Sequence, residues 1–459
     1  MKSPFTQPIP FREGPESYRR LCHEAEEPFC LYSGGGGRYS YLGFNPLLKV
    51  DFYPDGIRWG GGEKKQTICE NPFDWMEKKF VHSVLPSIQD FFGSGWVGFL
   101  AYEMASFADG VLPRRELPPD FLLGSFGLYD PLLVFDHEKK EAWASSWGLA
   151  EDFSSHEGLA KERVFELSSR CRSFPDSFPL EPSAVIPPWE KFRSNFTREK
   201  YESAVRRILD YLAEGDCYQV NLSQQFSADF SPSPDLFSLF WERAKAHPAP
   251  FSAFLDAGAL QILSLSPEEF LKIQGNKIET RPIKGTRKRS LNAEEDLRIL
   301  TELESAPKDQ AELLMIVDLE RNDLGKICKA GSVKVPRLKE VESFDYVHHL
   351  VATVVGELRE GVTPFGALKA LFPGGSITGA PKRRAMQIIQ EIEPTPRGVY
   401  TGVIGYVDYS SMAQMNIAIR TLVYENGNFQ FGVGGGIVAE SDPKAEYEET
   451  LTKAKVFSG

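Results

Sequence analysis

Apolar and polar residues alternate with different periods along the chain, and the change of period predicts both helices and strands. After Thr197, apolar residues recur every three or four positions until Gly215, so we predict a helix that Thr197 caps and Gly215 ends. The next run, residues 217–226, alternates with a period of two and predicts a strand. The helical stripe consists of Tyr201, Val205, Ile208 and Leu212.

Turn and capping residues place further elements. Residues 268–274 and 276–283 read as strands around the Gly275-Asn276 turn, which predicts a hairpin. Strands and helices are mixed without regular βαβ alternation, a pattern typical of an α+β fold. The predicted helix starts are Asn292, with Glu295 as in a capping box, Pro307, and Asp442-Pro443.

A segment rich in Pro and Ser divides the chain. The 459 residues exceed a typical single domain and predict either two regions or one large composite fold. We place an N-terminal region at residues 1–172, a connection at 173–195 and a catalytic region at 196–459.

Composition narrows the class of protein. A hydrophobic content of 42% supports a sizeable core, and a net charge of -12 disfavours nucleic acid or a membrane as partner. The start has no apolar segment typical of a secretory signal, and no apolar run approaches membrane-spanning length. The cysteines are scattered, so we expect reduced thiols and a cytoplasmic protein. They are Cys22, Cys30, Cys69, Cys171, Cys217 and Cys328.

Two carboxylate pairs have the spacing of neighbours on a helix face. Glu446 and Glu449 are three residues apart, with Lys453 one turn further, and Asp309 and Glu312 repeat the spacing. An incomplete carboxylate cage of this type suits Mg²⁺, which keeps water and substrate oxygens in its shell. The alternative for each pair is a solvated acidic face.

Glycine-rich segments are candidates for anion binding. Residues 373–382 place glycines before a helix that should begin near Pro381, and residues 431–438 form a second such stretch. Tight turns are the alternative for both. Arg420 could meet a carboxylate or simply lie at a sheet rim, and His348-His349 could serve acid–base chemistry or be structural.

Lys284 lies in the segment Pro-Ile-Lys-Gly-Thr, in a strongly basic stretch. Cationic neighbours or desolvation would lower the pKa of its amine, which is ordinarily ~10.4, and expose a nucleophile. A basic, solvated loop is the alternative. The surrounding cationic residues are Arg281, Arg287, Lys288 and Arg289.

Taken together, these segments resemble the chorismate-utilising enzyme family. The matching segments, in order, are GDCYQVNLSQ, SLSPEEF, RPIKGT, KDQAELLMIVDLERNDLGKIC, HHLVAT, PGGSITGAPK, IAIRT, GVGGGIV and EYEETLTKA, with looser matches in LYSGGGGRYSYLG and GWVGFLAYE. The resemblance implies a large mixed or antiparallel, β-sandwich-like sheet core with surrounding helices, as in anthranilate synthase component I.

Two positions separate the branches of this family. Isochorismate and salicylate synthases place a water-activating lysine where this chain has Gln219, and anthranilate synthases typically read P-I-A-G-T where this chain has Lys284. The sequence therefore looks like aminodeoxychorismate synthases, which aminate chorismate at C4 on the route to p-aminobenzoate and folate. An anthranilate synthase component, or a non-catalytic regulator that binds chorismate or tryptophan, is the alternative.

The resemblance also implies residue roles. Glu312 and Glu449 would bind Mg²⁺ directly, with Glu446 and Asp309 in the outer shell, although many relatives have Glu in place of Asp309. Glu268 would be the general acid, Lys284 the nucleophile, and His349 a neighbour of the reacting ring. The substrate carboxylates would be held by Thr378, Tyr400, Arg420, Gly434, Gly435 and Lys453.

Relatives in this family take ammonia from a glutamine amidotransferase, and no such module is visible in this sequence. A separate glutaminase subunit is therefore implied. A Leu-Leu-Glu-Ser segment lies near the tryptophan pocket of some relatives. Here the matching text is CLYSGG, with Tyr32 before Ser33.

Overall fold

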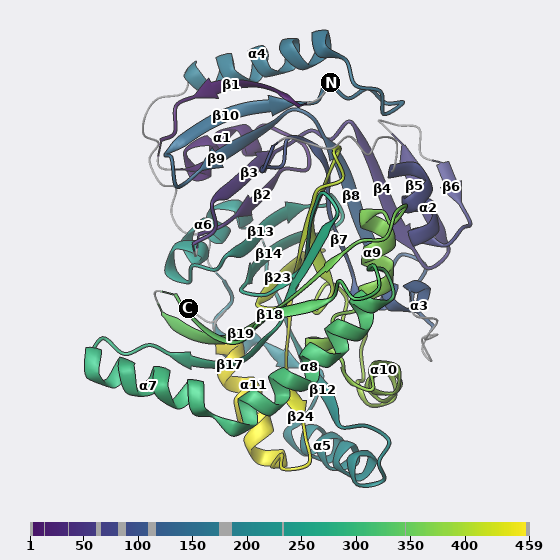
Figure 1. Cartoon of the computed structure of the whole chain (residues 1–459), viewed down its shortest axis with the longest axis vertical. Coiled ribbons are helices and arrows are strands. Elements are labelled where there is room, and N and C mark those ends of the chain that lie inside the picture. The colour runs from purple at the N-terminus through teal and green to yellow at the C-terminus, as the bar shows by residue number, and fades with distance from the viewer. Residues whose placement is uncertain are drawn as a thin grey trace.

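Two large antiparallel sheets form the centre of the protein in the computed structural model, which describes residues 3–12, 14–34, 36–60, 66–80, 89–108, 116–173, 186–231, 234–344 and 346–455. Helices surround the sheets on their outer faces (Figure 1). Within these residues, no helix is both long and apolar enough to cross a membrane.

The first sheet combines strands from both ends of the chain. Its centre is the pairing of β2 with β13, in which Phe254 lies opposite Cys30. In spatial order its strands are β1 (Phe5–Ile9), β10 (Glu141–Ser146), β9 (Leu132–Asp136), β3 (Tyr39–Gly43), β2 (Phe29–Tyr32), β13 (Phe251–Asp256), β14 (Gln261–Ser266), β23 (Thr421–Glu425), β24 (Asn428–Ile437), β12 (Gln219–Asp229) and β11 (Arg193–Ser194), with β20 (Gly379–Ala380) also on β12.

The second sheet is built in the same composite way. Its junction is the pairing of β21 with β7, in which Gly405 lies opposite Gly98. In spatial order its strands are β17 (Ile283–Lys288), β19 (Val347–Glu357), β16 (Lys277–Arg281), β15 (Glu269–Gln274), β22 (Ala413–Ile417), β21 (Val403–Asp408), β7 (Gly95–Leu100), β8 (Gly124–Tyr129), β4 (Leu48–Tyr53), β5 (Gly56–Gly60) and β6 (Gln66–Ile68), with β18 (Lys334–Ser343) also on β19.

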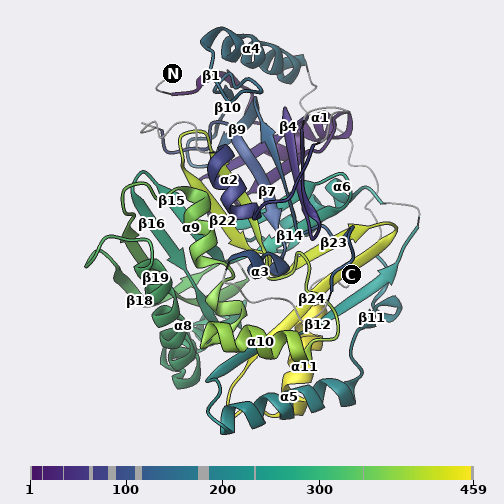
Figure 2. The same cartoon turned by 90° about the vertical axis from the view of Figure 1, so that its right-hand side faces the viewer.

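The helices pack on the sheets in groups. In the lower half of Figures 1 and 2, α5 and α11 lie side by side against β12 and β24, and α8 packs on β17 and β19. The α-helices are α1 (Arg19–His23), α2 (Pro72–Phe80), α3 (Ala105–Ala108), α4 (Glu157–Ser173), α5 (Arg198–Ala213), α6 (Leu236–Ala246), α7 (Ala293–Ser305), α8 (Pro307–Gly325), α9 (Pro364–Leu371), α10 (Lys382–Ile392) and α11 (Pro443–Ala454). The 3₁₀ turns are η1 (Pro15–Tyr18), η2 (Tyr102–Met104), η3 (Trp189–Lys191) and η4 (Gly375–Ile377).

An apolar layer between the two sheets makes the core sandwich-like. Phe29 and Leu255 of the first sheet and Phe99 and Ile404 of the second belong to one buried cluster. Further clusters lie on the outer faces, beneath α4 and α6 on one side and beneath α8 and α9 on the other. The α+β class with a large antiparallel sheet core is therefore confirmed.

The predicted local elements are present. The Thr197 hydroxyl oxygen accepts a hydrogen bond from the Lys200 N–H at the start of α5, and Gln274 pairs with Lys277 across the predicted hairpin turn. Asn292 and Asp442 cap α7 and α11, and α8 begins at Pro307. The division at residues 173–195 stays a prediction, since residues 174–185 lie outside the described part and each sheet takes strands from both sides.

Candidate active site

Lys284 lies on β17 with its amine buried between an acidic helix and a backbone turn. Its Nζ is 3.4 Å from the carbonyl oxygen of Ser376, to which it donates, and 4.0 Å from Glu312 Oε2. Burial lowers the pKa of the amine, while the carboxylates of Glu312 and Glu268 act in the opposite direction. The predicted nucleophile is therefore a shielded amine rather than a solvated loop residue.

Gly285 allows α8 to approach this lysine. Its φ is +78°, and a Cβ there would lie 3.0 Å from the Asp309 carboxyl carbon. A side chain at this position would therefore crowd Asp309 and strain the backbone. Asp309 accepts a hydrogen bond from Arg287 Nη2 at 2.8 Å, so this carboxylate is already paired with a cation of β17.

Glu268 directly precedes β15 and interacts electrostatically with the same lysine. It is only 4% exposed, and burial raises the pKa of its carboxyl group, against the opposing charge of Lys284. The Ile283 N–H donates to its Oε1 at 3.4 Å, and its backbone carbonyl accepts from the Ile417 N–H at 3.0 Å. A buried carboxyl with a raised pKa suits a general acid.

The C-terminal helix brings two of its glutamates against the glycines of β24. A Cβ added at Gly435 would lie 3.3 Å from Glu446 Oε2, 3.8 Å from Glu449 Oε1 and 3.9 Å from Lys453 Nζ. Lys453 donates to the Gly434 carbonyl at 2.9 Å and forms a 2.7 Å ion pair with Glu449. The absence of a side chain at Gly435 thus leaves space for these three charged groups to lie close to the backbone of β24.

All four predicted metal ligands interact electrostatically with at least one other member of the set. Burial raises the pKa of Glu312, and the negative charges of Asp309 and Glu449 add to that effect. Burial also raises the pKa of Glu446, and the negative charge of Glu449 adds to that rise. Repulsion between carboxylates is relieved by a cation, and oxygen donors suit Mg²⁺, so these residues fit the predicted metal. Among the described residues, no group of three or more His, Cys, Asp or Glu side chains is arranged so that it could hold a metal ion, so this fit rests on the chemistry of the donors alone.

Sequence reasoning missed Lys308. Its positive charge opposes the rise in the pKa of Glu312 and Glu446 and contributes to the lowered pKa of Glu449, although it lies on the exposed side of α8. Its spacing of four residues from Glu312 is a signal that the sequence contained.

His349 and Arg420 form a second part of the site. Burial lowers the pKa of His349 to about 3, with the positive charge of Arg420 contributing, so the imidazole is neutral at physiological pH. Its Nδ1 lies 2.8 Å from the Thr286 hydroxyl, two residues after Lys284. The backbone carbonyl of Arg420 accepts from the Leu265 N–H at 2.9 Å, but its guanidinium forms no hydrogen bond or ion pair with other described residues, and burial lowers its pKa. An unpaired guanidinium of this kind suits an anionic ligand.

Thr378 directly follows the η4 turn that contacts Lys284, whereas Tyr400 lies on a separate turn before β21. The Thr378 hydroxyl donates to the Gly374 carbonyl at 2.9 Å, and its own carbonyl accepts from the Asn221 N–H at 2.8 Å. The ring of Tyr400 covers Gly432, where a Cβ would overlap it. Tyr400 interacts electrostatically with Arg397 and Glu393, and it is not among the charged neighbours of Lys284.

A cavity of about 730 Å³ lies apart from Lys284. It is lined by Tyr32 and Ser33 of the CLYSGG segment and by Glu269, whose Oε1 accepts from Gln414 Nε2 at 2.6 Å. Burial raises the pKa of Glu269 to about 7. The two adjacent glutamates of the SLSPEEF segment thus lie in different places: Glu268 is beside Lys284, and Glu269 lines this cavity.

Comparison with known proteins identifies the fold class and then the family. The crystal structure of anthranilate synthase component I from Streptococcus pneumoniae TIGR4 superposes with a TM-score of 0.79 at 33% identity, covering 91% of this chain and 92% of that one. The chain therefore has the anthranilate synthase component I fold. The sequence profile described as chorismate binding enzyme matches residues 27–459, and the chain belongs to that family.

Curated relatives come from two branches of the family. The aminodeoxychorismate synthase component 1 of Escherichia coli is 40% identical over 91% of this chain and 88% of its own length. The anthranilate synthase component 1 of Aquifex aeolicus is 38% identical over 83% of this chain and 76% of its own length. Overall similarity thus establishes the family but does not separate the two branches.

Proposed function

We propose that the chain aminates chorismate at C4 with ammonia and releases 4-amino-4-deoxychorismate, in p-aminobenzoate and folate synthesis. The observation that carries the proposal is the buried Lys284 amine, 4.0 Å from Glu312 and next to the buried acid Glu268. An alanine at this position, as in the P-I-A-G-T segment, would provide no such amine.

The first displacement would use Lys284 and Glu268. The neutral amine attacks C2, both double bonds of the ring diene shift by one position, and the C4–O bond breaks while Glu268 donates its proton, so that the hydroxyl leaves as water. Burial favours the reactive form of both groups, because it lowers the pKa of the amine and raises that of the carboxyl.

The second displacement would restore the original double bonds. Ammonia attacks C4, both ring double bonds shift back, and the C2–N bond breaks so that Lys284 leaves as a neutral amine. The product carries an ammonium group at C4, and Glu268 regains a proton from solvent. Two displacements, each with allylic shift, place the new nitrogen at C4, which direct attack at C2 does not do.

Mg²⁺ would be held by Glu312 and Glu449, with Glu446 and Asp309 around them. When bound, it would supply positive charge that neutralises a substrate carboxylate. Arg420 would hold a second anionic group through its unpaired guanidinium, and Lys453 and the Gly434–Gly435 backbone would line the same position. Neutral His349 would lie near the ring.

The partner would be a glutamine amidotransferase subunit that supplies ammonia. Purified alone, the chain should use ammonium salts and not glutamine. The deciding experiment combines the protein, chorismate, Mg²⁺ and an ammonium salt and identifies the product by chromatography and mass spectrometry. We expect 4-amino-4-deoxychorismate, whereas fluorescent anthranilate as the main product would identify an anthranilate synthase. Tight chorismate binding without turnover, even with a glutaminase, would favour a regulator.

A further inference from the structure

We propose that Arg397 is a positioning residue for the reaction centre, because it fixes the η4 turn whose carbonyl group receives the Lys284 amine. Arg397 contacts neither Lys284 nor the predicted metal ligands, and no role for it followed from the sequence. The inference rests on the proposed function where it concerns turnover, and on geometry alone where it concerns Lys284.

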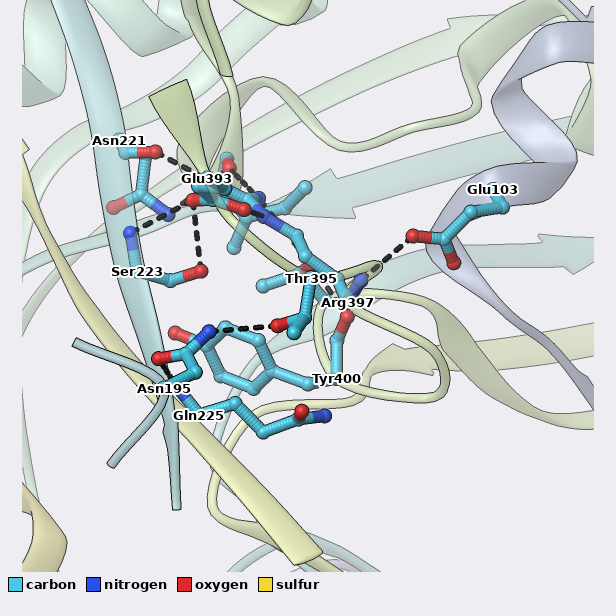
Figure 3. A network of polar contacts seen from close by, with 11 residues as sticks. Glu103, Asn195, Asn221, Ser223, Gln225, Glu393, Thr395, Arg397 and Tyr400 are labelled. Carbon is cyan, nitrogen blue, oxygen red and sulfur yellow. Dashed lines mark hydrogen bonds and ion pairs between the residues drawn. The ribbon is translucent and has the colours of Figure 1, made fainter. Parts of the chain in front are cut away.

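Arg397 lies at the centre of a saturated polar network (Figure 3). It is 5% exposed and donates from Nε to Glu393 Oε2 at 2.9 Å and from Nη2 to Glu393 Oε1 at 2.8 Å. Although burial opposes its charge, Glu393 raises the pKa of the guanidinium. Glu393 also accepts from the N–H and the hydroxyl of Ser223, both at 2.8 Å, which ties the pair to β12.

Adjacent carbonyl groups connect this network to the predicted nucleophile. Arg397 Nη1 donates to the Ile377 carbonyl at 2.9 Å, and Asn221 Nδ2 donates to the same oxygen at 3.0 Å. The preceding carbonyl, that of Ser376, accepts from Lys284 Nζ. One short turn is thus held from one side by Arg397 and contacts the lysine on the other, so a shift of the guanidinium would move the oxygen that orients the amine.

A second connection runs through the N-terminal region. Glu103, in the GWVGFLAYE segment, accepts from the Arg397 N–H at 2.7 Å and from the Gly398 N–H at 3.0 Å. The guanidinium carbon of Arg397 lies 4.6 Å from the centre of the Tyr102 ring. Figure 3 shows Glu103 reaching the backbone of Arg397 from the side opposite Asn221. Residues far apart in sequence therefore fix both the backbone and the side chain of Arg397.

Arg397 also touches the segment of the predicted substrate residues. Its Nη1 lies 3.3 Å from the Thr401 hydroxyl, next to Tyr400, and the Ile377 carbonyl that it holds directly precedes Thr378. The same side chain thus sets the spacing between the loops of Thr378 and Tyr400. Positional errors of about 1 Å at such a centre can reduce a rate by about 10²-fold.

The test compares Arg397→Lys with the control Arg384→Lys. Arg384 forms an ion pair with Asp216 on the partly exposed side of α10, so its replacement changes an arginine without touching η4. We expect Arg397→Lys to lower kcat by about 10²-fold with a smaller change in KM for chorismate. A folded Arg397→Lys protein with kcat equal to that of the control would overturn the proposal.

A second readout does not depend on turnover. The rate at which Lys284 reacts with a small amine-directed reagent is measured by peptide mass spectrometry, at one fixed pH and without chorismate or Mg²⁺. Release of the amine from the turn should change this rate by about fivefold, the effect of losing one hydrogen bond. If the Lys284 modification rate is unchanged in folded Arg397→Lys, the positioning role of Arg397 is wrong, even if the proposed reaction is confirmed. If wild type forms no aminated product, the proposed function fails while this measurement still decides the inference.

Should Arg397→Lys not fold, Glu103→Gln provides the second variant. It keeps Arg397 and the Glu393 pair and weakens only the backbone contact at the Arg397 and Gly398 N–H groups. We expect changes of kcat and Lys284 reactivity in the same direction and of smaller size. A folded Glu103→Gln protein with wild-type values of both would contradict the proposal.

Discussion

Arg420 and Arg397 are both largely enclosed, but their surroundings differ. Arg397 bonds to two carboxylate oxygens and two backbone carbonyls, and the neighbouring charge raises its pKa. Arg420 lies beside neutral His349, its guanidinium has no hydrogen-bond or ion-pair partner among the described residues, and burial lowers its pKa. An arginine whose N–H donors are all paired within the protein has a structural role, because removing it would leave its partners buried without a cation. An arginine whose guanidinium has unpaired donors can bind an anionic ligand.

The same contrast separates the two groups of acids. Glu393 is hydrogen-bonded inside the Arg397 network, while Glu312 has a single long ion pair among the described residues, with Lys284 at 4.0 Å, and carries a raised pKa. The carboxylates around Lys284 are therefore incompletely neutralised by the protein itself, and a bound cation would stabilise them. We expect changes there to affect catalysis first, and changes around Arg397 to affect both stability and catalysis.

The largest expected effect is that of Lys284→Ala. Removal of the nucleophile should reduce C4 amination by about 10³–10⁴-fold. Residual product at high ammonia should shift towards C2 amination, because the space beside C2 is then open. Intact-protein mass spectrometry with chorismate and no ammonia should show an adduct on wild type that is absent from Lys284→Ala. Undiminished C4 amination by the variant would show that this lysine is not the nucleophile.

Removing a charge from the predicted metal ligands should have the next largest effect. Glu312→Gln and Glu449→Gln keep the side-chain volume but weaken cation binding, so turnover at ordinary Mg²⁺ should fall by about 10²-fold, with partial recovery at high Mg²⁺. Glu448→Gln is the matched control, since Glu448 pairs with Arg198 on the exposed face of α11. Turnover of Glu312→Gln within twofold of wild type would refute the metal assignment.

Two methionine variants test the arginine comparison directly. Arg397→Met leaves Glu393 buried without its cation, which should lower the free energy of unfolding by about 3–5 kcal/mol. Arg420→Met should change it by less than about 1 kcal/mol and instead raise KM for chorismate by about 10- to 100-fold. Urea unfolding and steady-state kinetics measure both quantities. The comparison breaks if the two variants destabilise the protein equally.

The smallest expected effect concerns pH. Burial raises the pKa of Glu103 to about 7 from the ordinary 4.5, so the folded protein retains a proton that the unfolded chain releases. Its contribution to stability is full below pH 4.5 and is lost as the pH rises through 7. Glu103→Gln should therefore reduce the difference in unfolding free energy between pH 5 and pH 8 by about 1–3 kcal/mol. An identical pH dependence would show that Glu103 does not titrate in this way.

Local signals in the sequence predicted elements well. Thr197, Asn292 and Asp442 were identified as helix starts because capping depends on a few neighbouring residues, and all three cap helices in the structure. The face of α11 was also predictable from the spacing of Glu446, Glu449 and Lys453, which meet at Gly435. These features depend on residues within one or two turns of each other.

Contacts between distant segments were not predictable in this way. Residues 217–226 were expected to have one apolar and one polar face, yet Tyr218 is 72% exposed and Gln219 is fully buried. The sheet partner and the covering helices decide burial at these positions, and a period of two does not encode them. Most partners of Arg397 were missed for the same reason, because they lie in η2, β12 and η4, although Glu393, four residues before it, had the spacing of a local signal.

The composite sheets have a consequence for synthesis of the chain on the ribosome. The Gly93 N–H donates to Asp408 Oδ2 at 2.8 Å, although the two residues are 315 positions apart. Strand β7 therefore cannot pair with β21 until most of the polypeptide has been made. Until then, the edge of β7 that pairs with β21 lacks its hydrogen-bond partners. A ribosome that stalls before residue 403 would leave a nascent chain with open strand edges, a natural substrate for chaperones.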